Sequence, residues 1–154
     1  MSPGACLVTG SGGFIGRPVC AALLARGVPV VGLDPQPGSS TVPGGLTVVQ
    51  GSVANPQLLH QLFNEHRFES VIHTGGISGP MLARETPSIV CEANVIGTIH
   101  LLEVCRQHGV RRLVHLSSAA AYGHTPPAPV PDDAPLRAKD LYGALEGAGH
   151  YVPR

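Results

Sequence analysis

The 154-residue chain contains no tryptophan and only three phenylalanines and three tyrosines. Proteins that bind single-stranded nucleic acid stack bases on aromatic side chains along a basic groove. This chain has too few aromatic residues for such a surface, and its ten Lys and Arg residues are balanced by ten Asp and Glu residues. The composition therefore argues against nucleic acid as a partner, and no excess of positive charge favours an acidic membrane surface.

Long apolar runs and paired cysteines are also missing. No unbroken apolar run approaches the roughly 20 residues of a bilayer span, and no basic segment followed by a long apolar stretch opens the chain. The four cysteines have no C-x-x-C spacing and the eight histidines are scattered, which favours buried reduced thiols over a disulfide framework or a metal site. We expect a cytoplasmic protein without a metal or membrane contact, folded as one domain over residues 1–154.

A glycine-rich turn between a short strand and a helix is the most informative stretch. The apolar run 5–8 predicts a strand, and the apolar residues that follow the turn recur with helical spacing. Gly10, Gly13 and Gly16 lie between them in the pattern G-x-x-G-x-x-G, which differs from the usual dinucleotide fingerprint G-x-G-x-x-G. Such glycines let a ligand approach the backbone, and the helix N-terminus offers free N–H groups to an anion. The turn favours a pyrophosphate site, although a tight turn without a ligand has the same pattern.

The rest of the chain alternates short apolar runs with helical patterns. Strands are predicted over 28–33, 46–49, 70–74 and 113–116, and helices from Pro56, over 87–108 and over 140–151, with a loop over 35–45. This alternation predicts an α/β fold with a Rossmann-type, doubly wound parallel sheet in the strand order 3-2-1-4-5. Ligands of such sheets bind beyond the carboxyl ends of the strands, where the strand order reverses.

Four segments are expected to meet at this edge of the sheet: residues 10–16, Asp34, residues 75–78 and residues 117–118. Asp34 lies 18 residues after Gly16, where an acidic side chain can accept both hydroxyls of an adenosine ribose. Its charge would repel a 2′-phosphate, so NAD is favoured over NADP as the cofactor. The alternative is that Asp34 is only a solvated turn residue.

Five motifs, at residues 9–16, 71–76, 94–98, 117–123 and 142–143, occur in an order that resembles a known family. It is the NAD-dependent epimerase/dehydratase family of the extended short-chain dehydrogenase/reductase superfamily, typified by UDP-glucose 4-epimerase. The resemblance implies hydride transfer at a carbinol of a sugar or nucleotide sugar. It covers nearly the whole chain, which corresponds to the N-terminal portion of the family.

The resemblance also implies a catalytic pair and a cofactor site. In the family, a hydroxyl at the position of Ser118 holds the reacting carbinol, and a tyrosine at the position of Tyr142 moves its proton. Both residues are therefore predicted to be catalytic. The residues implied for the cofactor are Gly10, Gly12, Gly13, Phe14, Ile15, Gly16, Asp34, Ser52, Val53, Thr74, Gly75, Gly76, Ser78 and Asn94.

One position departs from the family pattern in a way that affects catalysis. Glu146 lies one helical turn after Tyr142, where the family has a lysine that assists the tyrosine and holds the nicotinamide ribose. A carboxylate there disfavours ionisation of the phenol and has no hydrogen to donate when ionised. We expect impaired catalysis unless another cation takes its place, and Lys139 is the candidate.

The family also continues beyond the tyrosine helix with further strands and a substrate domain. We therefore expect either a fragment or a protein without its substrate half. The leading hypothesis is the NAD-binding domain of an epimerase, dehydratase or sugar dehydrogenase, and the alternative is a catalytically inactive nucleotide-binding or interaction module. Surplus apolar positions predict a homodimer through the helices over 87–108 and 140–151.

Overall fold

The computed structural model describes residues 4–36, 46–124 and 129–148. The chain forms two compact units, unit 1 with residues 1–75 and 100–116 and unit 2 with residues 76–99 and 117–154. Most of the loop predicted over 35–45, and the end of the helix predicted over 140–151, lie outside the described residues.

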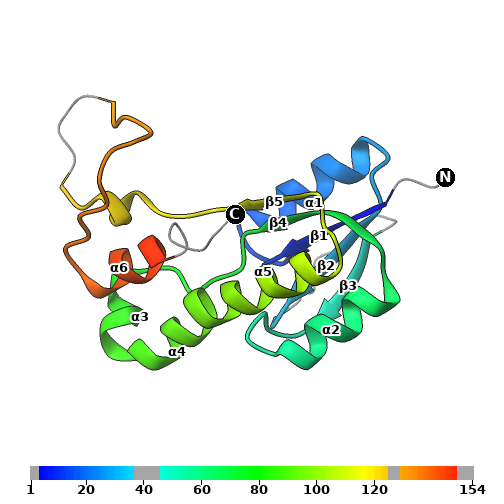
Figure 1. Cartoon of the computed structure of the whole chain (residues 1–154), viewed down its shortest axis with the longest axis horizontal. Coiled ribbons are helices and arrows are strands. Elements are labelled where there is room, and N and C mark those ends of the chain that lie inside the picture. The colour runs from blue at the N-terminus through cyan, green and yellow to red at the C-terminus, as the bar shows by residue number, and fades with distance from the viewer. Residues whose placement is uncertain (1–3, 37–45, 125–128, 149–154) are drawn as a thin grey trace. The chain divides into compact units, whose positions relative to one another are not determined.

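Unit 1 is built on a five-stranded parallel sheet (Figure 1). Its strands are β1 (Ala5–Thr9), β2 (Val30–Asp34), β3 (Leu46–Gln50), β4 (Phe68–His73) and β5 (Arg112–His115). They are arranged in the order β3-β2-β1-β4-β5, and every neighbouring pair is parallel. The predicted Rossmann-type topology is confirmed, and the strand order reverses between β1 and β4.

Helices cover both faces of this sheet. Helix α1 (Gly16–Ala25) packs on one face, and α2 (Pro56–Glu65) and α5 (Gly97–Gln107) pack on the other. Successive side chains of a strand point to opposite faces, so Leu7 joins the cluster under α2 and α5, whereas Cys6 and Val8 join the cluster under α1. Because both faces are covered, β1 and β2 are apolar along most of their length, without alternation.

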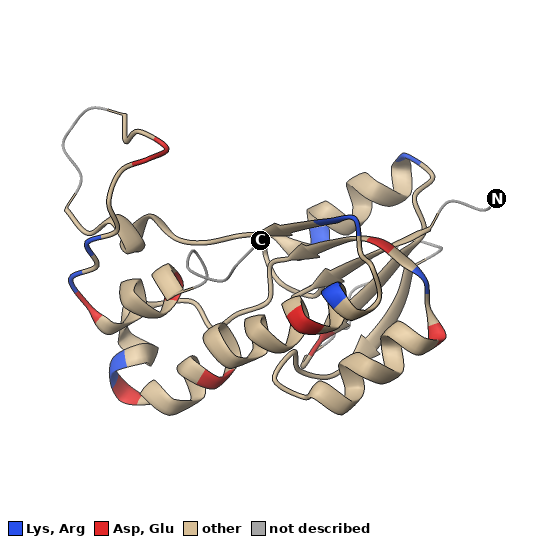
Figure 2. Cartoon of the chain, viewed as in Figure 1, with Lys and Arg blue, Asp and Glu red and all other residues tan. Residues whose placement is uncertain are grey.

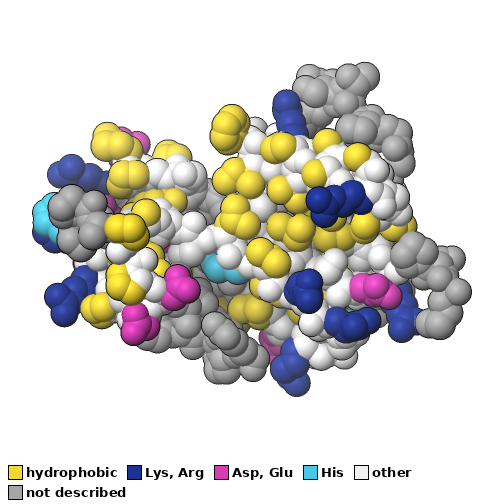
Figure 3. Space-filling view, turned by 90° about the horizontal axis from the view of Figure 1, so that it is seen from above, with side chains coloured by type: hydrophobic (Ala, Val, Ile, Leu, Met, Phe, Trp, Pro, Cys, Tyr) yellow, Lys and Arg dark blue, Asp and Glu magenta, His cyan; other side chains and the backbone are white. Residues whose placement is uncertain are grey.

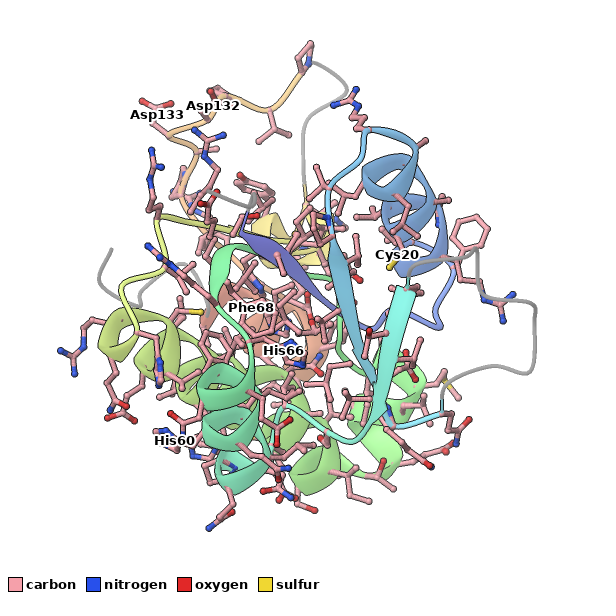
Figure 4. All side chains as sticks on the ribbon, turned by 90° about the vertical axis from the view of Figure 1, so that its right-hand side faces the viewer. Cys20, His60, His66, Phe68, Asp132 and Asp133 are labelled. Atoms are coloured by element: carbon pink, nitrogen blue, oxygen red, sulfur yellow. The ribbon has the colours of Figure 1, made fainter. Side chains whose placement is uncertain are left out.

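Three of the four cysteines are buried, as predicted, and none of the four is in a disulfide. Burial raises the pKa of Cys20 to about 11 and that of Cys105 to about 12, so both stay protonated thiols at neutral pH. Cys20 lies on α1 (Figure 4). Within the described part of the chain, no three His, Cys, Asp or Glu side chains are grouped so that they could hold a metal ion.

The helix predicted over 87–108 runs from Pro87 to Gln107, and its middle is not a regular α-helix. Helix α4 (Pro87–Cys91) continues into a π-helical segment, η1 (Glu92–Ile96), and then into α5. By length and composition alone, the helical segment from Pro87 to Gln107 could cross a membrane. A search for unbroken apolar runs does not find this segment, because charged residues interrupt it. In this fold the α5 residues Leu101 and Val104 lie in the core of unit 1, as expected of a helix that covers a sheet.

The described part of unit 2 is helical. Besides α4 and η1 it contains α3 (Pro80–Glu85), the 3₁₀ helix η2 (Ala119–Tyr122) and α6 (Leu141–Ala148). Helix α6 corresponds to the predicted helix over 140–151, whereas α3 and η2 were not predicted. Both are short, and a six-residue or four-residue helix has too few apolar positions to show a helical period in the sequence.

The surface of the described residues carries both signs of charge. Basic and acidic side chains are interspersed along the ribbon (Figure 2) rather than gathered by sign. Apolar side chains reach the surface between them (Figure 3), and the large exposed ones of unit 1 are Phe14, Ile15 and Val114.

Candidate functional site

The turn that leaves β1 has a backbone that requires glycine at two positions. Gly10 has a φ of 67°, and a Cβ there would lie 2.8 Å from the backbone nitrogen and Cα of Gly75. A Cβ on Gly16 would collide with the carbonyl oxygen of Gly10, so α1 begins directly against the turn. This helix has no side-chain cap and no acidic residue in its first turn, and the N–H groups of Arg17 and Val19 donate to the carbonyl oxygens of Gly13 and Ile15. The positive end of the helix dipole, which favours an anion, therefore faces the glycine turn without an acidic side chain of the helix itself.

Asp34 lies at the end of β2, and backbone N–H groups hold its carboxylate. Gly12 donates to Oδ2 at 2.9 Å, and Gln36 donates to Oδ1 at 2.8 Å. Asp34 is buried, with 8% of its surface exposed, so the alternative of a freely solvated turn residue does not describe it. Each carboxylate oxygen keeps a further lone pair for a hydroxyl donor. The structure thus joins the glycine turn and the predicted ribose-binding acid in one arrangement.

The other predicted cofactor residues of unit 1 differ in their surroundings. Phe14 and Ile15 are exposed on the glycine turn, with 97% and 47% of their surfaces accessible. Ser52 accepts a hydrogen bond from the backbone of Ala54, and Val53 is part of the core under α2 and α5. Local turn geometry and packing therefore account for Ser52 and Val53 without a ligand.

The second predicted turn follows β4, beside the first. The Thr74 hydroxyl donates to the carbonyl oxygen of Thr9 at 2.7 Å, and the Gly75 N–H donates to the Thr9 hydroxyl oxygen at 3.1 Å. That hydroxyl is also 2.6 Å from Nδ1 of His73. Neither Thr9 nor His73 was assigned a role from the sequence, although a polar residue that ends a buried strand is a signal that could have found both.

Asn94 is the centre of a polar cluster in unit 2. Its Oδ1 accepts from the N–H of Ile77 at 2.8 Å, and its Nδ2 donates to the carbonyl oxygen of Ile77 at 3.0 Å. These two bonds fix which way the amide points. The second hydrogen of Nδ2 is donated to Oε1 of Glu146 at 2.8 Å. Asn94 thus links Ile77, in the loop before α3, to Glu146 on α6. Its predicted contact with a cofactor stays a prediction.

Glu146, the residue in place of the family lysine, is half-buried on α6. Burial raises the pKa of its carboxyl group, and the hydrogen bond from Asn94 opposes that shift in part. The Ser117 hydroxyl also contacts the backbone carbonyl oxygen of Glu146, at 3.4 Å. Because Ile77 orients the Asn94 amide, the second hydrogen of Nδ2 is directed at position 146, where the Glu146 carboxylate accepts it.

The two predicted catalytic residues come from neighbouring elements of unit 2. Ser118 caps η2, accepting from the N–H of Ala120 at 3.2 Å. Tyr142 lies in the first turn of α6 and precedes Gly143, where a Cβ would collide with the carbonyl oxygen of Ala120. The bare Gly143 lets α6 approach η2 closely.

Among the remaining predicted residues of unit 2, Gly76 lies beside Asn94, because a Cβ there would be 3.2 Å from Asn94 Oδ1. Gly76 and Ser78 are exposed in the loop before α3. Lys139 precedes Asp140, whose carboxylate accepts from the N–H of Gly143 at 2.7 Å at the start of α6. Lys139 therefore lies before the first residue of α6, so it does not share a helical face with Tyr142.

These features together define a class of protein. A doubly wound parallel sheet, with a glycine turn at the order reversal and a buried acid after β2, is the Rossmann dinucleotide-binding class. The sequence model of the NAD dependent epimerase/dehydratase family matches residues 6–152, so the chain belongs to this family.

Relatives and solved structures agree with this assignment. UDP-glucose 4-epimerase 1 of Oryza sativa subsp. japonica is 34% identical in an alignment 149 residues long, which covers 89% of this chain and 42% of that protein. The crystal structure of Thermus thermophilus UDP-glucose 4-epimerase in complex with NAD has a TM-score of 0.88 at 32% identity, over 96% of this chain and 49% of that one. Thermotoga maritima UDP-glucose 4-epimerase with UDP-glucose has a TM-score of 0.86 at 26% identity, over 94% and 48%. The chain thus spans less than half the length of these relatives.

Gly143 and Gly147 form a matched pair on α6 that tests the close packing against η2. Alanine at Gly143 would collide with the Ala120 carbonyl oxygen, whereas a Cβ at Gly147 would make ordinary contacts at 3.7 Å and 3.8 Å. We expect Gly143→Ala to lower the free energy of unfolding by about 1–3 kcal/mol through overpacking. Gly147→Ala should raise it, by up to about 1 kcal/mol, because alanine is the better helix former. Urea unfolding of both variants checks this, and equal effects would contradict the packing described.

Glu146 should make the stability of the protein depend on pH. Because burial raises the pKa of Glu146 in the folded state, folding favours its protonated form, so this contribution is present below the unfolded pKa of about 4.3 and is lost as the pH rises through the folded pKa. Glu146→Gln keeps an acceptor for Asn94 and removes the charge. We expect its free energy of unfolding, relative to wild type, to increase over this pH range and to level off above it.

Urea unfolding between pH 4 and pH 8 measures this difference. Glu103→Gln, an exposed position on α5, is the control for removing a carboxylate from the surface. A difference between Glu146→Gln and wild type that stays constant with pH would contradict the burial of the charge.

Proposed function

We propose that this chain binds NAD and is the cofactor-binding part of an oxidoreductase-type enzyme that acts on nucleotide sugars, as an epimerase, dehydratase or dehydrogenase. The observation that carries the proposal is the joined arrangement of the glycine turn and Asp34, in which Gly12 donates to the Asp34 carboxylate. The printed names of the relatives, UDP-glucose 4-epimerases solved with NAD or UDP-glucose, support the same function.

The residues of unit 1 fit the parts of a dinucleotide. The glycine turn directly before α1, at the positive end of a helix without an acidic residue in its first turn, suits a pyrophosphate. The remaining lone pairs of Asp34 suit two ribose hydroxyls, and its negative charge disfavours a 2′-phosphate. Bound NAD would supply a hydride acceptor, and bound NADH a donor.

The residues of unit 2 are proposed to handle the substrate carbinol. Ser118 would donate a hydrogen bond to its oxygen, and Tyr142 would remove or return its proton. Glu146 is unfavourable for the second role, because its carboxylate stands one helical turn from the phenol and opposes formation of a phenolate. We propose that proton transfer is correspondingly weak in this chain.

The second candidate function is a nucleotide-binding or interaction module without catalysis, and Glu146 is the observation that favours it. The Asn94–Glu146 hydrogen bond is well formed, which indicates a position adapted to an acceptor. Turnover of UDP-glucose or UDP-galactose with NAD would support the enzyme, and NAD binding without turnover would support the module.

Self-association through the helical segment from Pro87 to Gln107 and α6 is also proposed. Ile89, Ile96 and Ile99 are exposed on this segment, with 54%, 41% and 42% of their surfaces accessible. Apolar side chains grouped on a helix are a common basis of a dimer interface. Light scattering should give the mass of a dimer, and a monomer at high protein concentration would contradict this proposal.

Asp34 provides the direct test of NAD binding. NAD should raise the melting temperature of the wild type, since a ligand that binds only the folded state stabilises it. Asp34→Asn keeps the shape of the side chain but removes its charge and one acceptor, so we expect NAD to bind about 10-fold to 100-fold more weakly. NADP should lose less affinity than NAD, because the repulsion of its 2′-phosphate is removed.

Asp132→Asn is the matched control, because Asp132 is exposed on the loop before α6 (Figure 4). It should bind NAD as the wild type does. No effect of millimolar NAD on the melting temperature of the wild type would rule out the proposed function.

A further inference from the structure

The Thr9 hydroxyl makes two hydrogen bonds at the point where the strand order reverses. Its oxygen accepts from the N–H of Gly75 at 3.1 Å, and it lies 2.6 Å from Nδ1 of His73. Thr9 and His73 are buried, with 0% and 1% of their surfaces exposed, so water does not compete for these bonds. The hydroxyl therefore connects the end of β1 to two successive parts of the β4 turn.

The Gly75 N–H can only donate, so the direction of its bond to the Thr9 oxygen is fixed. The direction of the bond to His73 depends on the tautomer of the imidazole. We assign the neutral tautomer without a hydrogen on Nδ1, in which Nδ1 accepts the Thr9 hydroxyl hydrogen. Burial, together with the smaller effect of the neighbouring ring of His115, lowers the pKa of His73 to about 4, so the neutral form predominates at neutral pH.

The backbone of Thr9 adds to the same connection. Its carbonyl oxygen accepts from the Thr74 hydroxyl at 2.7 Å and from the Thr74 N–H at 3.3 Å. We call the group of Thr9, His73, Thr74 and Gly75 the Thr9 clasp. It holds Gly75 against Gly10, where the two backbones are so close that neither residue has room for an ordinary Cβ.

We propose that His73 is a positioning residue of the NAD site, which acts through Thr9. By accepting the hydroxyl hydrogen it orients the Thr9 oxygen toward the Gly75 N–H, and this keeps the two glycine turns in the shape that receives the pyrophosphate. The inference rests on the proposed NAD binding, but the clasp itself can be measured without a ligand.

Two pairs of variants separate the hydrogen bond from packing. His73→Leu removes the acceptor, whereas His73→Asn places an amide oxygen near the position of Nδ1. Thr9→Val removes the hydroxyl, whereas Thr9→Ser keeps it. The control is His60→Leu, because His60 is exposed on α2 and lies away from the glycine turns (Figure 4).

The two readouts are the dissociation constant for NAD, by calorimetry, and the hydrogen-exchange rate of the Gly75 amide in the free protein, by NMR. We expect His73→Leu and Thr9→Val each to weaken NAD binding and speed this exchange by about tenfold, the effect of one buried hydrogen bond. His73→Asn, Thr9→Ser and His60→Leu should stay close to the wild type in both readouts.

The results that overturn the inference are distinct from those that overturn NAD binding. If the wild type binds NAD and His73→Leu leaves both readouts unchanged, His73 has no positioning role and the proposed function stands. Equal losses in His73→Leu and His73→Asn would show that only the packing of the ring matters. If the wild type does not bind NAD, the proposed function fails. Should His73→Leu not fold, the Thr9→Val and Thr9→Ser pair gives the same test with His73 intact.

Discussion

The direct backbone contact between Gly10 and Gly75 is the constraint on which the candidate site of unit 1 depends. Parallel strands β1 and β4 are neighbours, and the chain leaves them in opposite directions because the strand order reverses there. The two turns must therefore pass each other within van der Waals distance, which excludes side chains at Gly10 and Gly75. This arrangement places the N-terminus of α1 and the buried Asp34 at the edge of the sheet where a nucleotide binds in this fold.

Unit 2 follows a different principle, because its polar groups are committed to one another. Asn94 uses its amide on the backbone of Ile77 and on Glu146, and Glu146 uses one oxygen on Asn94. Such a cluster is stabilising only while each donor faces an acceptor. Glu146 is therefore part of a hydrogen-bonded cluster, and a lysine at this position would remove the acceptor of the second Asn94 hydrogen.

The sequence was sufficient for the sheet and for the acid at its edge. Apolar runs of strand length and the glycine spacing predicted the strand order, and the position of Asp34 at the end of a strand predicted its place beside the turn, where Gly12 now binds it. The limits of the strands were less well predicted: the run over 28–33 became Val30–Asp34, because strand ends depend on pairing with neighbours.

Features that depend on distant contacts were not predictable in this way. The bond between Asn94 and Glu146 joins residues 52 positions apart, and the bond between Thr9 and His73 joins residues 64 apart. The π-helical segment η1 has the same apolar spacing as an α-helix over so few residues, so periodicity does not distinguish them. Ser52 and Val53 make turn and core contacts that the sequence did not indicate, and their predicted contact with a cofactor stays a prediction.

The central claim is that unit 1 keeps a nucleotide site formed by the glycine turn, Asp34 and the β4 turn. Hydrogen exchange of the wild type with and without saturating NAD tests it most directly, because it reports which amides a ligand protects. The account predicts slower exchange for residues 10–16, for Gln36 and for Gly75, with no change at the opposite end of the sheet around Phe63 and His108. Unchanged exchange in those segments, or protection confined to the opposite end, would contradict it.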